Sequence, residues 1–552
     1  MALRGRNLID QPLLNKGTAF TDDERGSLGL RGLLPATVAT IDEQVALELE
    51  HVRRKPDDLE RFIGLAALQD RNETLFYRVL AENLEEFLPI VYTPTVGRAC
   101  QQFSHIMRRP RGVWITPADI DRIDVILRTA ADGEQVRLIV VTDNERILGL
   151  GDQGAGGMAI PIGKLALYTV AAGIYPAWTL PVSLDVGTDR AELLDDPLYL
   201  GHRAPRLRGE AYDEVVEAFV EGVRRVFPQC VVQWEDFKQH TALRILRRYQ
   251  HRLPSFNDDA QGTGAVVLGG LLAARREEGG LSGERFLILG AGAAAIGISR
   301  MLHRQLEAER VQIDQGSPVI ALMDRGGLVQ LGRDQLADDQ RSFAVDPVWF
   351  TRAGLDAASF TDPVAVARAL KATVLIGTTG CPGAFTEALV REVAKHAAVP
   401  IILPLSNPGD QAEAQPVDVL EWTDGRALVA TGSPSAGVEI GGRLRTIGQA
   451  NNVFVFPGVG LAAIVAEARE VTAEAFLVAA RQLASVVSED RLASGAIFPP
   501  IRVLRQVARG VAIAVIRHLR DTGYGRQFRD EEIEPAVDRA MWRPEYVPYR
   551  PR

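Results

Sequence analysis

The stretch RFLILGAGAAAIG, residues 285–297, decides the fold that the sequence predicts. Its apolar first half is typical of a buried strand, and a glycine-containing turn follows, which opens a helical pattern. Gly290 would allow the tight turn, and Gly292 would let a pyrophosphate approach the backbone closely. Small side chains at Ala295 and Gly297 would let the helix pack on the sheet. The stretch therefore predicts the phosphate-binding turn of a dinucleotide-binding unit.

An acidic residue after the next strand supports this prediction. Asp324 ends the apolar run PVIALMD (318–324), where a carboxylate binds the adenosine ribose hydroxyls. Its distance from the glycines exceeds the usual ~20 residues, so the intervening helix and loop must be long. A carboxylate repels a 2′-phosphate, which favours NAD. Arg325 and Arg341 could pair with such a phosphate, so NADP stays open as the alternative.

Strands separated by helical segments extend in both directions from this turn. Apolar runs bounded by turn or acidic residues predict buried strands at 137–143, 181–186, 230–237, 373–380, 399–408 and 427–434. Up to about residue 110, apolar residues recur at three- and four-residue spacing, which predicts helices. The fold class expected is α/β, with a doubly wound parallel-sheet NAD domain, a second α/β domain and a helical N-terminal region.

The bulk composition narrows the class of protein. With 552 residues, the chain exceeds what one hydrophobic core supports, so two or three domains are expected. Hydrophobic residues make up 46% and charged residues 24%, as in ordinary globular proteins. The net charge of −9, with no long basic stripe, argues against a nucleic-acid partner. Cys100, Cys230 and Cys381 lie far apart, which suits a reducing compartment and argues against a structural zinc site.

Neither the start of the chain nor its most apolar window predicts a membrane or secretory segment. The first 20 residues lack a continuous apolar region and a small-residue cleavage site. The window at 158–180, MAIPIGKLALYTVAAGIYPAWTL, is interrupted by Pro161, Lys164 and Pro176. We therefore expect a cytoplasmic protein with no membrane partner.

Two pairs of neighbouring acids are candidate metal ligands. Asp258 and Asp259 stand in FNDDAQGTG (256–264), and Glu235 and Asp236 close the predicted strand CVVQWEDF. One acid of the first pair could simply cap the following helix, with a solvated neighbour. Ligands of open α/β sheets gather at the carboxyl ends of strands, and an all-oxygen site favours Mg²⁺ or Mn²⁺ over zinc. From spacing alone, separate surface acids and a metal site fit equally well.

Two further residues have both a structural and a catalytic interpretation. Lys164 interrupts an otherwise apolar helix, where it could extend its amine to solvent at the helix face or act as a desolvated base. Tyr92 stands in VYTPTVG, a loop with proline and glycine, and taken alone fits a packed tyrosine with a satisfied hydroxyl.

Eight motifs then occur in one order: LPIVYTPTVGRAC, VVTDNERILGLGDQG, PIGKLALYT, QWEDF, FNDDAQGTG, GAGAAAIG, LSNP and NNVFVFPG. Together they resemble the malic enzymes, from about residue 15 onward, and DRGG and WTDGRALVATGSP resemble bacterial NAD-preferring members. The resemblance implies oxidative decarboxylation of L-malate to pyruvate and CO₂, with reduction of NAD, possible use of NADP, and dependence on Mg²⁺ or Mn²⁺.

The resemblance also implies a role for individual residues. Lys164 would take the proton from the C2 hydroxyl, Asp258 would polarise Lys164, and Tyr92 would protonate the enol. Arg146 would bind a malate carboxylate near the nicotinamide, and Asn452 would contact the substrate. The metal ligands would be Glu235, Asp236 and Asp259. The residues near the cofactor would be Arg146, Asp259, Gly290, Gly292, Ala295, Gly297, Asp324 and Asn407, the last of which would also contact the substrate.

The family fold implies the following domain organisation. Residues 1–110 would form a helical region with oligomer contacts, and 111–258, completed by about 450–518, would form the catalytic domain. Residues 259–449 would form the NAD domain, and 519–552 a tail. A homodimer or a homotetramer would be typical.

Two rival functions use the same motifs. Malolactic enzyme keeps the same metal and NAD sites but converts L-malate to lactate and CO₂. A non-catalytic protein that senses NAD or malate would be expected to lose Lys164, Tyr92 or a metal carboxylate, and all of them are present. A plain 2-hydroxy-acid dehydrogenase would use a histidine–acid pair instead.

Overall fold

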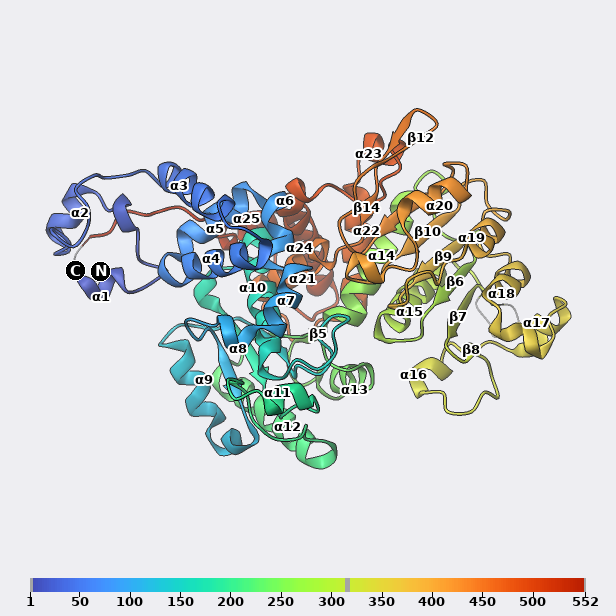
Figure 1. Ribbon diagram of the computed structural model, residues 1–552, viewed down its shortest axis with the longest axis horizontal. Coiled ribbons are helices and arrows are strands. Elements are labelled where there is room, and N and C mark those ends of the chain that lie inside the picture. Colours follow the sequence, from blue (N-terminus) through green and yellow to red (C-terminus); the bar gives the residue numbers. More distant parts are fainter. Residues whose placement is uncertain (1–2, 313–317, 551–552) are drawn as a thin grey trace. The chain divides into compact units, whose positions relative to one another are not determined.

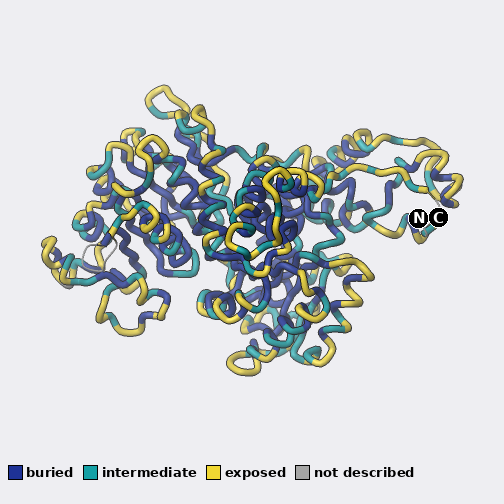
Figure 2. Tube along the Cα trace, turned by 180° about the vertical axis from the view of Figure 1, so that it is seen from behind, coloured by how far each residue is buried: buried dark blue, intermediate teal, exposed yellow. Residues whose placement is uncertain are grey.

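The computed structural model describes residues 3–312 and 318–550. The chain divides into two compact units (Figure 1), the first formed by Met1–Phe237 with Pro535–Arg552 and the second by Lys238–Glu534. In both units the buried segments, dark blue in Figure 2, alternate with exposed loops. Each unit is described by itself below.

The first unit begins with a helical region. Threonine N-caps with capping boxes start two of its helices, since Thr21 pairs with Glu24 and Thr40 with Glu43. The predicted helical N-terminal region is therefore confirmed. Its helices are α1 (Arg6–Ile9), α2 (Asp22–Ser27), α3 (Ile41–Arg53), α4 (Asp58–Arg71), α5 (Glu73–Glu82), α6 (Leu84–Val91), α7 (Thr95–Gln101) and α8 (Phe103–Ile106).

A parallel sheet forms the rest of the first unit. Its strands β1 (Val113–Ile115), β3 (Thr179–Leu184), β2 (Leu138–Thr142) and β4 (Val231–Trp234) pair in that order, with Leu138 opposite both Thr179 and Val231. The two central strands, β2 and β3, are almost wholly buried, which explains their continuous apolar runs. The accompanying helices are α9 (Ile123–Ala131), α10 (Ala159–Ala172), α11 (Ala191–Asp195) and α12 (Gly209–Val226).

One helical stretch, Gly154–Ala172, is apolar and long enough to cross a membrane by length and composition alone. However, 94% of its most apolar window is buried inside the structure, and α10, which forms most of it, packs on β2 and β3. Its apolar composition is thus accounted for by a place in the core of the unit.

The C-terminal segment 541–550 lies along the first unit. The Trp542 N–H donates to the Gly173 carbonyl over 2.7 Å, and no Cβ would fit at Gly173 beside it. The Tyr549 N–H donates to Glu24 over 2.7 Å, and the Lys16 amine lies 4.0 Å from the centre of the Tyr549 ring. The segment is irregular in structure, but it is held by specific contacts.

The second unit contains the doubly wound sheet. Its strands run in the order β14–β11–β10–β9–β6–β7–β8, all parallel except the β7–β8 pair. The first strand of this sheet along the chain is β6. The chain then adds β7 and β8 on one side of it and β9, β10, β11 and β14 on the other, so the strand order reverses between β6 and β9. The strands are β6 (Phe286–Leu289), β7 (Ile320–Asp324), β8 (Gly327–Leu328), β9 (Val374–Gly377), β10 (Ile401–Pro404), β11 (Leu428–Thr431) and β14 (Gly448–Gln449).

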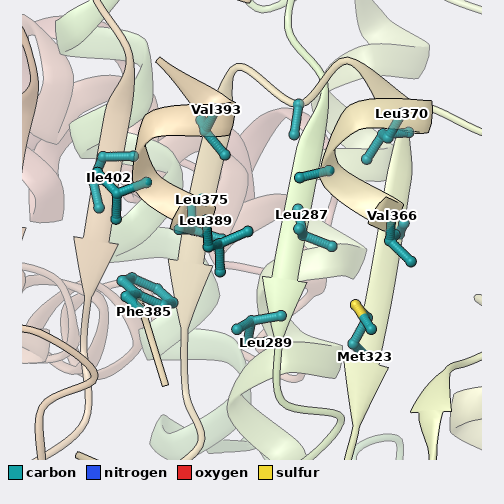
Figure 3. Packing of buried hydrophobic residues seen from close by; sticks show 14 of the residues in the cluster. Leu287, Leu289, Met323, Val366, Leu370, Leu375, Phe385, Leu389, Val393 and Ile402 are labelled. Carbon is teal, nitrogen blue, oxygen red and sulfur yellow. The ribbon is translucent and has the colours of Figure 1, made fainter. Parts of the chain in front are cut away.

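Helices cover this sheet and complete the unit. Leu287, Leu375 and Ile402 of the strands meet Leu370 of α18 and Leu389 of α19 in one apolar cluster (Figure 3). The helices are α13 (Gln239–Tyr249), α14 (Thr263–Ala274), α15 (Ala293–Ala308), α16 (Asp338–Arg341), α17 (Pro347–Arg352), α18 (Pro363–Leu370), α19 (Glu387–Val393), α20 (Pro416–Trp422), α21 (Phe456–Val465), α22 (Ala473–Ser485), α23 (Glu489–Ala493), α24 (Leu504–Asp521) and α25 (Asp530–Ala540), which continues into the first unit.

The predicted fold class is confirmed, and all the predicted strands occur. The structure adds short strands that the pattern did not indicate, because two or three residues are too few to show a period. These are β1, β8 and β14, together with β5 (Ser255–Asn257) and the hairpin of β12 (Val438–Ile440) and β13 (Arg443–Arg445).

Candidate functional site

Two acids stand at the carboxyl end of β4 in the first unit. Glu235 and Asp236 are both buried, with exposed fractions of 1% and 6%. Asp236 has a φ of +54°, which is strained for a non-glycine residue. The Arg146 N–H donates to its carbonyl over 3.2 Å. The interpretation of Glu235 and Asp236 as surface acids is wrong, because the fold places both carboxylates in the interior.

Lys164 and Tyr92 meet at Glu235. The Lys164 amine, on α10, is 3% exposed and lies 3.0 Å from Glu235 Oε1. The Tyr92 hydroxyl donates to the same oxygen over 3.4 Å, and the amine lies 5.2 Å from the centre of the tyrosine ring. A Cβ at Gly163 would lie 3.1 Å from that ring, so the glycine admits it. The interpretation in which Lys164 extends its amine to solvent is therefore wrong, since the lysine is in a buried ion pair.

Two polar residues that the sequence analysis missed hold Glu235 in place. Gln233 precedes it by two residues on β4, so both side chains lie on the same face of the strand. The Gln233 amide donates to Glu235 Oε2 over 2.6 Å, and Tyr168 of α10 donates to the Gln233 carbonyl oxygen. A glutamine inside an otherwise apolar strand was the available signal, because a buried amide needs partners.

Arg146 projects from a loop that Arg206 and Tyr212 hold in place by hydrogen bonds. The loop follows β2, and Arg146 itself is exposed. Arg206 donates to both carboxylate oxygens of Asp152, over 2.6 and 2.9 Å, and to the Asp143 carbonyl over 2.7 Å. Tyr212 donates to the Asp143 carboxylate over 2.6 Å. Burial raises the pKa of Asp143 above its usual range, although Arg206 and Tyr212 act to lower it. Arg206 was not predicted, because 54 residues separate it from Asp152.

In the second unit, the FNDDAQGTG stretch forms β5 and a π-helical turn, Asp258–Gly262. Asn257 caps this turn by accepting from the Ala260 N–H over 2.9 Å, so the interpretation of one aspartate as the cap is wrong. Asp258 is fully buried, and Asp259 is half-buried. Asn452 donates to Asp258 Oδ2 over 3.1 Å. Such π-helical turns are frequent at functional sites.

The glycine loop after β6 has the geometry that its sequence predicts. Gly290 has a φ of +121°, and a Cβ there would lie 2.2 Å from the Thr378 hydroxyl. Gly292 is the N-cap of α15 and has no side chain to block the approach of a ligand. Ala295 is fully buried. Gly297 differs from expectation, because its close neighbour is the Asp258–Gly262 turn and not the sheet.

Replacing Gly297 by alanine should destabilise the protein by about 1–3 kcal/mol, the usual cost of overpacking. The added Cβ would lie 2.0 Å from the Ala260 carbonyl oxygen, so α15 or the π-helical turn must move. Thermal unfolding followed by circular dichroism measures the effect. Gly283→Ala is the control, because nothing lies within 4 Å of a Cβ there. Equal melting temperatures for the two variants would contradict the described packing.

Asp324 lies at the end of β7, as predicted, and pairs with Arg333. Its Oδ1 accepts from Arg333 Nη2 over 2.6 Å and from the Gly326 N–H over 2.8 Å. Arg325 and Arg341 are exposed. The arginine that pairs with the carboxylate is thus one that the sequence analysis did not consider.

Asn407 follows β10, and its bond to Pro408 is a cis peptide. Its Oδ1 accepts from the Ser433 hydroxyl over 2.6 Å, and Ser433 follows β11. Gly432 leaves the space for this contact, since a Cβ there would lie 2.7 Å from the asparagine oxygen. The structure therefore holds Asn407 at the carboxyl ends of the strands.

Comparison with known proteins agrees with this arrangement. The family models described as "Malic enzyme, N-terminal domain" and "Malic enzyme, NAD binding domain" match residues 69–250 and 260–520. The chain is 45% identical to the NAD-dependent malic enzyme of Pseudomonas savastanoi pv. phaseolicola over 99% of its length and 97% of the relative's. It is 46% identical to that of Aeromonas hydrophila subsp. hydrophila, over 99% and 96%. The chain belongs to the malic enzyme family.

Solved structures support the fold. The crystal structure of Entamoeba histolytica malic enzyme matches with a TM-score of 0.57 at 20% identity, covering 93% of this chain and 90% of that one. The malic enzyme from Pyrococcus horikoshii matches with a TM-score of 0.54 at 23% identity, covering 83% and 89%. The predicted family resemblance is confirmed, whereas the roles of individual residues and the domain boundaries stay predictions.

Proposed function

We propose that the chain is an NAD-dependent malic enzyme, which oxidises L-malate and releases pyruvate and CO₂ while reducing NAD. Relatives of that name, 44–46% identical over 99% of the chain, support this function. In the structure, the observation that carries it is the buried group in which Lys164 and Tyr92 both contact Glu235. A candidate base and a candidate acid thus contact the same buried carboxylate, which supports the proposed chemistry.

The chain's own residues would divide the proton transfers between them. Lys164 accepts the proton of the C2 hydroxyl, and Tyr92 gives a proton to C3 after CO₂ has left. Arg146 and Asn452 bind the substrate, and Asp258 polarises Lys164. When bound, NAD would supply the acceptor for the C2 hydride, and a divalent ion would supply a positive charge beside the C2 oxygen.

The ligand set proposed for the divalent ion is Glu235, Asp236 and Asp259, a group of acids that could hold a metal. Three carboxylates give an all-oxygen donor set, which suits Mg²⁺ or Mn²⁺. Glu235 and Asp236 are buried, and the Lys164 amine pairs with Glu235. Buried carboxylates are stabilised by cationic partners, which supports a metal at this group.

The proposed NAD site is centred on the turn that follows strand β6 and on the last residue of strand β7. The Gly290–Gly292 loop at the start of α15 suits a pyrophosphate, and the Asp324 carboxylate suits the ribose hydroxyls. The residues assigned to the cofactor are Arg146, Asp259, Gly290, Gly292, Ala295, Gly297, Asp324 and Asn407. The proposal also includes a cytoplasmic location, which the scattered cysteines support, and a homodimer or homotetramer, which the family resemblance supports.

Incubation of the purified protein with L-malate, Mn²⁺ and NAD tests this function. We expect equal amounts of NADH and pyruvate, measured by absorbance and by product assay, and a slower reaction when NADP replaces NAD. Lactate without net NADH would contradict the proposal and identify a malolactic reaction. Malate that stays unchanged with both cofactors would exclude both enzymatic functions.

A further inference from the structure

Glu413 is a fully buried carboxylate that lies outside the residues assigned above. Its Oε1 accepts from the Thr379 N–H over 2.7 Å, from the Thr379 hydroxyl over 2.8 Å and from the Ser406 hydroxyl over 2.5 Å. Its Oε2 accepts from the Ser406 N–H over 3.3 Å. Hydrogen bonds to a charged acceptor are stronger than those between neutral groups. Glu413 therefore binds two separate segments of the chain, one at Thr379 and the other at Ser406.

These two segments are the loops at the carboxyl ends of neighbouring strands. Thr379 follows β9, and Ser406 follows β10. The Ser406 hydroxyl also accepts from the Gly380 N–H over 2.8 Å, so the loops are bonded to each other as well. A Cβ at Gly377, the last residue of β9, would lie 2.5 Å from the Glu413 side chain, so the carboxylate is seated against the strand end.

Both loops adjoin residues of the proposed NAD site. Strand β9 pairs with β6, and the strand order reverses between them, which is where open α/β sheets bind ligands. Thr378, next to Thr379, touches Gly290 of the phosphate-binding turn. Asn407 follows Ser406 directly and is bonded to Ser433 after β11. One carboxylate thus fixes two loops, of which one contacts the Gly290 turn and the other contains Asn407.

We propose that Glu413 is a positioning residue for the NAD site, which holds the β9 and β10 loops so that Asn407 and the Gly290 turn face the dinucleotide in a fixed arrangement. This inference rests on the proposed function, because that function names the dinucleotide. Glu413 acts through Thr379 and Ser406 and does not itself touch the cofactor.

Glu413→Gln tests the role, because the amide has nearly the same shape but places an N–H₂ group against the donors on Thr379 and Ser406. We expect the Kd of the full-length protein for NADH, measured by titration calorimetry without malate, to rise roughly tenfold. The KM for NAD should rise in parallel. Thr379→Val, which removes one hydroxyl donor, should give a smaller rise in Kd and decides the matter if Glu413→Gln does not fold.

Glu392→Gln is the matched control. Glu392 is also a buried carboxylate of the second unit, but it pairs with Arg368, Lys395 and His396, which lie in or directly after helices α18 and α19. Although burial raises it, hydrogen bonds from Lys395 and Arg368 bring the pKa of Glu392 down to about 2. This variant should lose thermal stability yet bind NADH like the wild type.

Two results would overturn the inference. If wild-type protein binds NADH, and both Glu413→Gln and Thr379→Val bind it as tightly as Glu392→Gln does, only the positioning role is wrong. If the wild-type protein binds neither NADH nor NAD, the proposed function fails and the positioning role fails with it.

Discussion

Lys164→Arg is expected to lower kcat for malate oxidation by roughly 10²–10⁴-fold, the range that general acid–base catalysis supplies. Arginine keeps the positive charge beside Glu235, but its guanidinium does not release its proton and so cannot serve as the base. The variant therefore separates proton transfer from charge compensation. Steady-state kinetics with saturating malate, NAD and Mn²⁺ measures the loss, and calorimetry with NADH shows whether the cofactor still binds.

Lys16→Arg is the control for this experiment. Lys16 is equally buried and pairs with Glu24 at 2.5 Å, but it belongs to the N-terminal helical region and to no proposed site. We expect its kcat to stay close to that of the wild type. A Lys164→Arg enzyme with a wild-type kcat would remove Lys164 as the base, and the buried ion pair would then be structural.

Asp236→Asn is expected to weaken Mn²⁺ binding by at least roughly 10–100-fold, which is the loss caused even by residues that only support metal ligands. The substitution removes one of three proposed anionic ligands and leaves the Lys164–Glu235 pair unchanged. Electron paramagnetic resonance of free Mn²⁺ during a titration gives the dissociation constant directly. Chelation with EDTA should abolish malate oxidation by the wild type, and added Mn²⁺ should restore it.

Asp185→Asn is the matched variant. Asp185 is another buried acid directly after a strand of the same sheet, β3, and accepts from the His202 N–H over 2.7 Å. The Mn²⁺ affinity of the Asp185→Asn protein should equal that of the wild type. Equal affinities for Asp236→Asn and Asp185→Asn would show that Asp236 is no ligand.

The strand pattern was predictable because buried parallel strands leave an unmistakable composition. Runs such as LIVV and FLIL, bounded by turn residues, gave the strands β2 and β6 close to their observed ends. The turn at Gly290 was likewise predictable, since its φ of +121° and the nearby Thr378 hydroxyl exclude other side chains at that position. Local sequence determines both features, so no long-range information was needed.

Hydrogen-bond partners that are far apart in the sequence were not predictable. Arg206 binds Asp152, from which 54 positions separate it, and Glu413 binds Thr379, from which 34 positions separate it. No local sequence pattern indicates either pair. The cap at Asn257 was missed for a different reason, because the two aspartates that follow are equally good capping residues. Burial of Lys164 also depends on Glu235, which is supplied by a distant strand.

The path of the C-terminal segment has a consequence for biosynthesis. The first unit needs Pro535–Arg552, so a ribosome must translate the whole second unit before Tyr549 can reach Glu24 and Lys16. The second unit is a single continuous stretch and can acquire all its internal contacts earlier. The N-terminal helices are therefore synthesised first, but their contacts with the C-terminal segment form last. Until then, Lys16 and Glu24 lack their contacts with Tyr549.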